Sequence, residues 1–143
     1  MSYDTDNLND IPTETPLMNG ESNTKITRVT EHTGKTGSVG YLITHSITDK
    51  TVKLDSGSIV DNYSFSVTDY IAKEVPENDD FKQMRLKKIK QYADASGYQG
   101  SSISEFLQSI TFLEGKEMLA TIRASKKGNN QINKVSKKTS NPF

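Results

Sequence analysis

The spacing of apolar residues changes period twice along this 143-residue chain. Apolar side chains alternate with polar or small ones over residues 39–48, again over 59–67, and again over 117–124. Between Pro76 and Gly97 they recur instead every three or four residues. Successive strand residues face opposite sides of a sheet, whereas helical neighbours recur every 3.6 residues. The pattern therefore predicts strands, then a helix, then strands again.

Turn residues divide the alternating segments into five predicted strands. They span residues 24–31, 39–48, 59–67, 117–124 and 131–137, with a short additional segment at 51–54.

A helical insertion is predicted between the third and fourth of these strands, over about residues 78–110. Acidic residues precede its first helix, Gly97 suits its end, and Ser102 with Glu105 has the spacing of a capping box at a second, short helix. Five strands with a helix in this place are typical of the OB-fold, a five-stranded, partly open barrel. An SH3-like barrel or a plain meander has nearly the same order of elements.

Composition limits the size of the core. Only 32% of residues are apolar, and no run approaches the roughly 18 apolar residues that a membrane helix needs. We expect one folded domain over 21–137, between an acidic flexible arm at 1–20 and a tail at 138–143. The arm has no secretory-signal pattern and the chain has no cysteine, so we expect a cytoplasmic location.

The formal net charge of zero conceals an uneven distribution. The first 21 residues carry five Asp or Glu and no Lys or Arg, whereas the remainder carries 18 basic residues against 13 acidic ones. A basic body with an acidic arm predicts a surface for a polyanion and a segment able to compete for it.

Sequence patterns for catalysis are absent. The two histidines, His32 and His45, lack a metal-ligand spacing, and no phosphate-binding glycine loop or nucleophile motif occurs. Asp55, Asp61 and Asp69 are candidates for a Mg²⁺-dependent nuclease, although solvated turn acids explain them better. We therefore predict no enzyme, no cofactor and no metal.

Binding of nucleic acid needs cations for phosphates and aromatic rings for bases. The candidate cations lie in the first hairpin loop, the helix and the last hairpin: Lys35, Arg85, Lys88, Arg123, Lys126, Lys127 and Lys134. The candidate rings are Tyr41, Tyr63 and Phe65. Core packing of these rings, a solvated helix face and lysines that protect a β edge remain alternative explanations.

Several short motifs follow one another along the chain. They are Gly20-Glu21, Gly34-Lys35-Thr36-Gly37, Asp61-Asn62-Tyr63, Ala95-Ser96-Gly97 and Leu113-Glu114-Gly115-Lys116, followed by Asn133 and Val135 in the last strand. In these motifs the chain resembles small phage-encoded single-stranded DNA-binding proteins with an OB-fold, over about residues 20 to 136. Ser22 departs from the aromatic residue that often follows the first motif, which weakens an aromatic role for the first strand.

The resemblance implies sequence-independent binding of single-stranded DNA that protects or presents it during phage replication or recombination in the host cytoplasm. Members often end in an acidic tail with Pro-Phe at its tip, which recruits replication proteins. Pro142-Phe143 matches the tip without the acidic tail, so the acidic arm or this tip is the candidate contact for such partners. No membrane contact is expected, and homo-oligomerisation stays open. The alternative is a non-enzymatic phage structural or adaptor protein that docks on other proteins.

Overall fold

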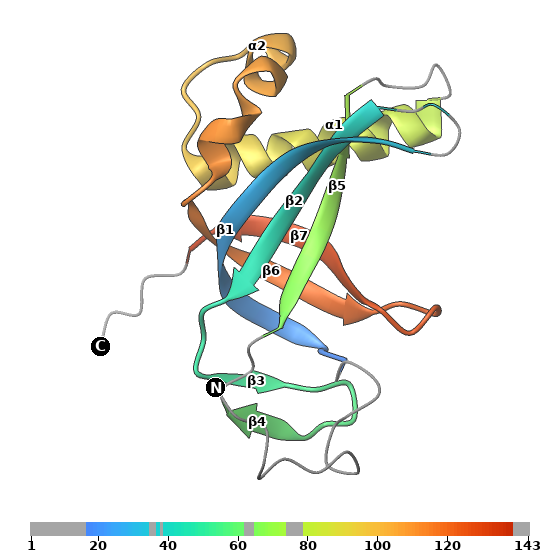
Figure 1. The fold of residues 1–143 in the computed structure, drawn as a ribbon, viewed down its shortest axis with the longest axis vertical. Helices are drawn as coiled ribbons and strands as arrows, with labels where there is room; N and C mark the ends of the chain where they lie inside the picture. The colour runs from blue at the N-terminus through green and yellow to red at the C-terminus, as the bar shows by residue number, and fades with distance from the viewer. Residues whose placement is uncertain (1–16, 35–36, 38, 62–64, 74–78, 139–143) are drawn as a thin grey trace, which may run out of the picture.

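The computed structural model describes residues 17–34, 37, 39–61, 65–73 and 79–138 (Figure 1). The protein is mainly β, with a five-stranded antiparallel sheet, a separate two-stranded hairpin and one long helix. Its elements are β1 (Gly20–Thr33), β2 (Val39–Ile47), β3 (Thr51–Lys53), β4 (Ile59–Asp61), β5 (Ser66–Ala72), α1 (Asp79–Ser96), α2 (Ile103–Gln108), the 3₁₀ helix η2 (Ile110–Leu113), β6 (Glu117–Ala124) and β7 (Asn130–Lys137).

β1 joins the two halves of the five-stranded sheet, whose order is β5-β2-β1-β6-β7. Its residues 24–33 pair with β2, and its residues 20–25 pair with β6. The register shifts between Ile26 and Arg28, which marks a β-bulge. Because a bulge bends a strand and increases its twist, β1 curves and carries β2 and β5 over β6 and β7 (Figure 1).

β5 and β7 are the two edges of this sheet. They approach one another, but no ladder of hydrogen bonds joins them in the described part of the chain. The sheet is therefore strongly curved and open.

The core lies between the two layers and against α1. Met118, Ala120 and Ile122 of β6 are fully buried, which confirms the predicted alternation. Ile89 and Tyr92 bring one side of α1 into the same core. Burial of each large apolar side chain contributes roughly 1.5–3 kcal/mol, so this side of α1 holds the helix on the sheet.

Local signals for the helix ends are confirmed. Gly97 follows α1 with φ 75°, a left-handed conformation that glycine adopts without strain. Ser102 Oγ accepts a hydrogen bond from the Glu105 amide at 3.2 Å and caps α2.

The prediction of one strand over residues 59–67 is wrong. β4 ends at Asp61 and β5 begins at Ser66, and the two strands belong to different sheets. The described residues thus form seven strands, with α1 between the fifth and the sixth. The reason lies in the hairpin: among the residues that the structure describes, β4 pairs with β3 alone. Its Ile59 is 73% exposed, so this apolar residue does not face the core.

The folded part begins earlier than the predicted boundary at residue 21. Met18 is 1% exposed and its N–H donates to Asn130 Oδ1 at 2.8 Å. Leu17 accepts a hydrogen bond from the Asp55 amide at 2.7 Å. Residues 17–19 are therefore held between the β3–β4 hairpin and the start of β7.

Candidate nucleic-acid interface

The strands β5, β2 and β1 present one face to the core and one to solvent. Register pairs place Thr68, Thr44 and Arg28 in one row across the three strands, and Tyr70, Leu42 and Thr30 in the next. Paired residues of neighbouring strands point to the same side of a sheet. This solvent side, here called the outer face, consists of Lys25, Arg28, Thr30, His32, Leu42, Thr44, Ser46, Ser66, Thr68 and Tyr70.

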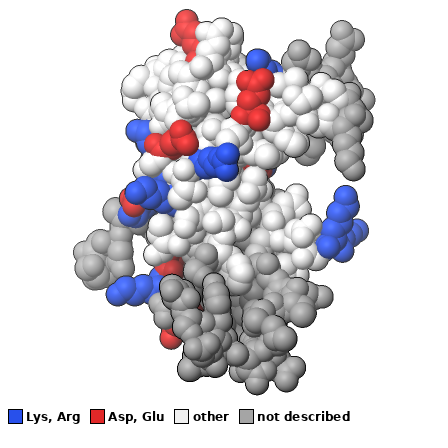
Figure 2. Space-filling model, viewed as in Figure 1, with Lys and Arg blue, Asp and Glu red and all other residues white. Residues whose placement is uncertain are grey.

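Serine, threonine and aromatic side chains, rather than a continuous basic patch, dominate the outer face. Only Lys25 and Arg28 bring charge to it. In the view of Figure 2 the basic side chains likewise stand apart from one another. Hydroxyl groups donate and accept hydrogen bonds without carrying charge. The outer face can thus contact a polar chain but cannot neutralise many phosphates alone.

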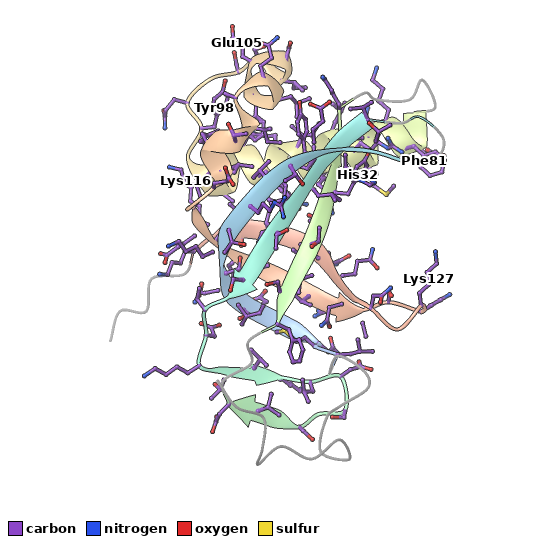
Figure 3. The ribbon with its side chains drawn as sticks, in the orientation of Figure 1. His32, Phe81, Tyr98, Glu105, Lys116 and Lys127 are labelled. Carbon is purple, nitrogen blue, oxygen red and sulfur yellow. The ribbon has the colours of Figure 1, made fainter. Side chains whose placement is uncertain are left out.

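An aromatic pair occupies one end of the outer face. The rings of Tyr70 and His32 meet edge to face, with centroids 6.4 Å apart and planes at 87°. Between them lies Gly40, where an added Cβ would come within 2.4 Å of the Tyr70 ring and 2.5 Å of the Ile71 carbonyl oxygen. Glycine at this position therefore leaves room for the Tyr70 ring beside β2 and next to His32. His32, labelled in Figure 3, is exposed, and Tyr70 is half-buried, so neither residue is enclosed in the core.

A groove opens at the other end of the outer face, between the start of β5 and the tip of the β6–β7 hairpin. It measures about 560 Å³ and is lined by Leu17, Ser66, Val67, Thr68, Lys127, Gly128, Asn129 and Asn130. Val67 is buried and forms its floor, whereas the hydroxyl side chains and the hairpin backbone are accessible. We call this feature the hairpin groove.

Short-range hydrogen bonds build the hairpin tip. The Ser125 amide donates to the Asn129 carbonyl at 2.8 Å, and the Gly128 amide donates to the Ser125 carbonyl at 3.0 Å. Gly128 has φ 82°, which favours glycine. The turn exposes Lys126 and Lys127, and Lys127 points away from the body of the protein (Figure 3).

The other predicted cations are dispersed. Lys35 lies outside the described residues. Arg123 and Lys134 are exposed on β6 and β7, and Arg85 is half-buried on α1. The ammonium of Lys88 contacts Asp69 Oδ1 at 2.7 Å and the Ile132 carbonyl oxygen at 3.4 Å. Lys88 is thus engaged by the sheet, and we omit it from the phosphate contacts.

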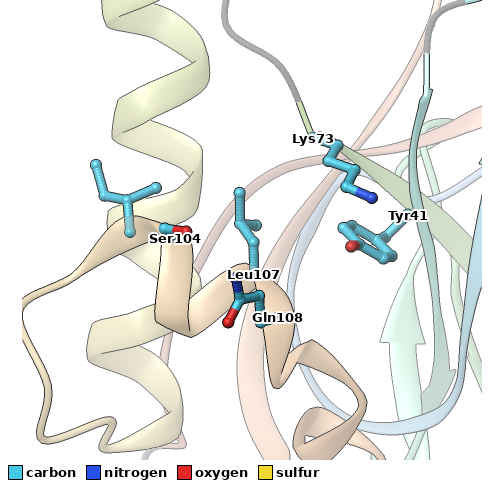
Figure 4. Close-up of a pocket in the computed structure, with 6 residues that line it drawn as sticks. Tyr41, Lys73, Ser104, Leu107 and Gln108 are labelled. Carbon is cyan, nitrogen blue, oxygen red and sulfur yellow. The ribbon is translucent and has the colours of Figure 1, made fainter.

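The predicted aromatic residues do not gather on the outer face. Tyr63 lies outside the described residues. Phe65 is partly buried against the core. Tyr41 points to the other side of β2, into a hollow of about 630 Å³ that Lys73 and the α2 residues Leu107 and Gln108 also line (Figure 4). Tyr41 and Phe65 are both partly buried and pack against the core.

A series of hydrogen-bonded polar side chains, here called the buried polar network, crosses the core beneath the outer face. Asp69 Oδ2 accepts a hydrogen bond from the Tyr92 hydroxyl at 2.7 Å. The same hydroxyl oxygen lies 2.8 Å from His45 Nε2, and His45 Nδ1 lies 2.8 Å from Thr24 Oγ1. Because Tyr92 has one hydroxyl proton and gives it to Asp69, Nε2 of His45 is the donor to Tyr92. Nδ1 of the neutral imidazole then accepts from Thr24.

Burial shifts the pKa values of two residues of the buried polar network. Desolvation lowers the pKa of His45 from 6.5 to about 4; the nearby Asp69 opposes this change and Lys88 adds to it. Burial, followed by the charge of Asp69 and the hydrogen bond to it, raises the pKa of Tyr92 well above 10. His45 and Tyr92 are both uncharged near neutral pH, so they fasten α1 to β2 and β5 without burying a net charge of their own.

Sequence reasoning missed Tyr70 and His32. The signal for Tyr70 was present, since Val67, Asp69 and Ile71 continue the alternation and leave Tyr70 on the opposite face. It was hidden because the predicted strand ended at residue 67. The predicted strand over residues 24–31 stops short of His32, whereas β1 extends to Thr33 and pairs His32 with Gly40.

No protein-family model fits the chain, and no curated protein aligns with it. Among the described residues, no group of three or more His, Asp or Glu side chains is arranged to hold a metal ion. The helices in the same part of the chain are too short or too polar to span a membrane.

Proposed function

We propose that this protein binds single-stranded DNA with little dependence on base sequence, through the outer face and the hairpin tip. The observation that carries the proposal is the Tyr70–His32 pair at one end of an accessible hydroxyl-rich face whose other end meets exposed Lys126 and Lys127. Unpaired bases stack on aromatic rings, and lysines bind the phosphates that join them.

The dimensions suit a short stretch of a single strand. Ser66 borders the hairpin groove and Tyr70 lies four residues further along β5, a path of about 13 Å at about 3.3 Å per residue. Thr44, Ser46 and Thr68 line this path. The bases of duplex DNA are already stacked on one another, so an aromatic pair of this kind favours a strand whose bases are unpaired.

The topology supports an OB-type fold for this surface. β1 pairs on both sides, α1 connects β5 to β6, and the edge strands β5 and β7 approach one another. OB-folds bind oligonucleotides across the face of their second and third strands, which correspond here to β2 and β5. On this basis we infer a role in protecting or presenting single strands during replication or recombination, without catalysis.

Anisotropy titrations of a labelled oligo-dT and of a duplex of equal length, each at two salt concentrations, test this function. We expect tighter binding of oligo-dT than of duplex, together with quenching of tyrosine fluorescence. With Lys25, Arg28, Lys126 and Lys127 as contacts, the slope of log K against log salt is about −3, at about −0.7 per phosphate. Equal binding of both DNAs, or none, would contradict the proposal.

A second candidate function is that of an adaptor that docks on another protein. Phe81 and Met84, near the start of α1, are 55% and 60% exposed. Exposed large apolar groups on a helix are typical of a protein contact. An adaptor role predicts no quenching by oligo-dT and a loss of partner binding on Met84→Ser.

A further inference from the structure

The chain enters the folded part inside the hairpin groove. Leu17, the first residue that the structure describes, lines this groove beside Lys127, Gly128 and Asn129. Hydrogen bonds fix the entry point: the Met18 amide donates to Asn130, and the Leu17 carbonyl accepts from Asp55. Any chain that precedes Leu17 therefore starts at the groove and cannot be moved from it without breaking these contacts.

The charge of that preceding chain is opposite to the charge of the hairpin tip. Residues 1–16 contain Asp4, Asp6, Asp10 and Glu14 and no Lys or Arg. The tip exposes Lys126 and Lys127, and no salt bridge holds either ammonium among the described residues. The β3–β4 hairpin adds no net charge beside Leu17, because the positive charge of Lys53 cancels the negative charge of Asp55. Opposite charges on two tethered segments favour contact, above all at low ionic strength.

The reach of the arm matches the surface. Glu14 is three residues from Leu17, so its backbone stays within about 10 Å of the groove. The sixteen residues extend up to about 55 Å, whereas the path from Ser66 to Tyr70 is about 13 Å. The arm is therefore long enough to follow the outer face.

We propose that residues 1–16 dock in the hairpin groove and on the outer face of their own chain, and that they compete there with the phosphates of a single strand. The arm would act as an internal polyanion that weakens binding and that a DNA strand must displace. The competition rests on the proposed function, whereas the docking itself does not.

Two full-length variants with equal net charge test the proposal. Asp10→Asn with Glu14→Gln removes two charges from the arm. Asp94→Asn with Glu105→Gln removes two exposed charges from α1 and α2 and serves as the control. Amide ¹H–¹⁵N spectra of DNA-free protein report on Gly128 and Asn129, and anisotropy titrations report on oligo-dT. Both are recorded at about 20 mM salt, where the screening length is about 20 Å, and again at about 300 mM.

We expect the Gly128 and Asn129 signals to move in the arm variant and not in the control. We also expect the arm variant to bind oligo-dT about fivefold more tightly than the control at low salt, and equally at high salt. Unchanged amide signals would overturn the docking, as would shifts that depend on protein concentration, because the arm of a second copy would then be the occupant. Signals that move while no variant binds oligo-dT would refute the proposed function and leave the docking intact.

Discussion

The Tyr92 hydroxyl donates a 2.7 Å hydrogen bond to Asp69 Oδ2 and thereby ties the middle of α1 to β5. Asp69 is 8% exposed and Tyr92 is fully buried. The other carboxylate oxygen accepts from Lys88 and from the Tyr70 amide. The carboxylate that anchors the helix thus also holds the backbone of Tyr70, whose ring lies on the outer face.

Removal of the Tyr92 hydroxyl should destabilise the fold. In Tyr92→Phe, Asp69 Oδ2 and His45 Nε2 both lose a partner in the core, and a buried polar group without a partner costs about 1–3 kcal/mol. We expect the free energy of unfolding, measured by urea denaturation, to fall by about that amount. Tyr70→Phe, which removes a hydroxyl from the surface, is the control and should change it by less than about 0.5 kcal/mol. Equal effects of the two substitutions would show that the hydrogen bonds of the buried Tyr92 hydroxyl add no more to the free energy of unfolding than a surface hydroxyl does.

Stability should depend on the protonation of His45. Its pKa is about 4 in the folded protein and near 6.5 when unfolded, so the unfolded state binds the proton more tightly. Stability is therefore complete above about pH 6.5, declines as the pH falls toward 4, and the His45 contribution levels off below that. The total loss is about 3 kcal/mol, at 1.36 kcal/mol per pKa unit.

Carboxylates titrate in part of the same range, so the measurement compares variants. Urea denaturation of wild type and His45→Gln at intervals from pH 7 to 4 isolates the histidine contribution. We expect the decline between pH 6.5 and 5 to disappear in His45→Gln and to persist in His32→Gln, since His32 is exposed. A decline that survives in His45→Gln would assign it to other groups.

The hairpin lysines should govern the salt dependence of binding. Each phosphate contact on a single strand adds about 0.7 to the slope of log K against log salt, so Lys126→Ala with Lys127→Ala should reduce the slope by about 1.4. Lys82→Ala with Lys87→Ala removes two exposed lysines from α1 and is matched in charge. Anisotropy titrations at several salt concentrations distinguish the pairs. A greater change from the α1 pair would move the interface to the helix.

The Tyr70 ring should contribute to binding by stacking. Tyr70→Leu should weaken oligo-dT binding by about 1–3 kcal/mol, about fivefold to 150-fold, whereas Tyr70→Phe keeps the ring and should bind as wild type. Thermal unfolding of both variants checks that the fold survives. If Tyr70→Leu binds normally and Tyr41→Leu does not, bases enter the hollow beside α2 instead of the outer face.

The sequence by itself determined which segments become strands and helices. Strict alternation predicted β2 and β6, and the period of three to four residues predicted α1 up to Gly97, because these patterns follow from the local geometry of the backbone. The alternation could not separate β4 from β5, since residues on either side of a break keep the same spacing. Strand pairing, which distinguishes the two, depends on partners far along the chain.

Only the tertiary structure decided which side chains are available. The sequence offers both Lys88 and Lys127 as phosphate contacts, yet the ammonium of Lys88 is engaged by Asp69 whereas Lys127 is exposed in a turn. Tyr41 of β2 and Tyr70 of β5 likewise lie on opposite faces of the same sheet. The curvature of β1 and the packing of α1 determine these differences, because they set which face of each strand is covered. The charge of residues 1–16 is visible in the sequence, but their starting point in the hairpin groove follows only from the fold.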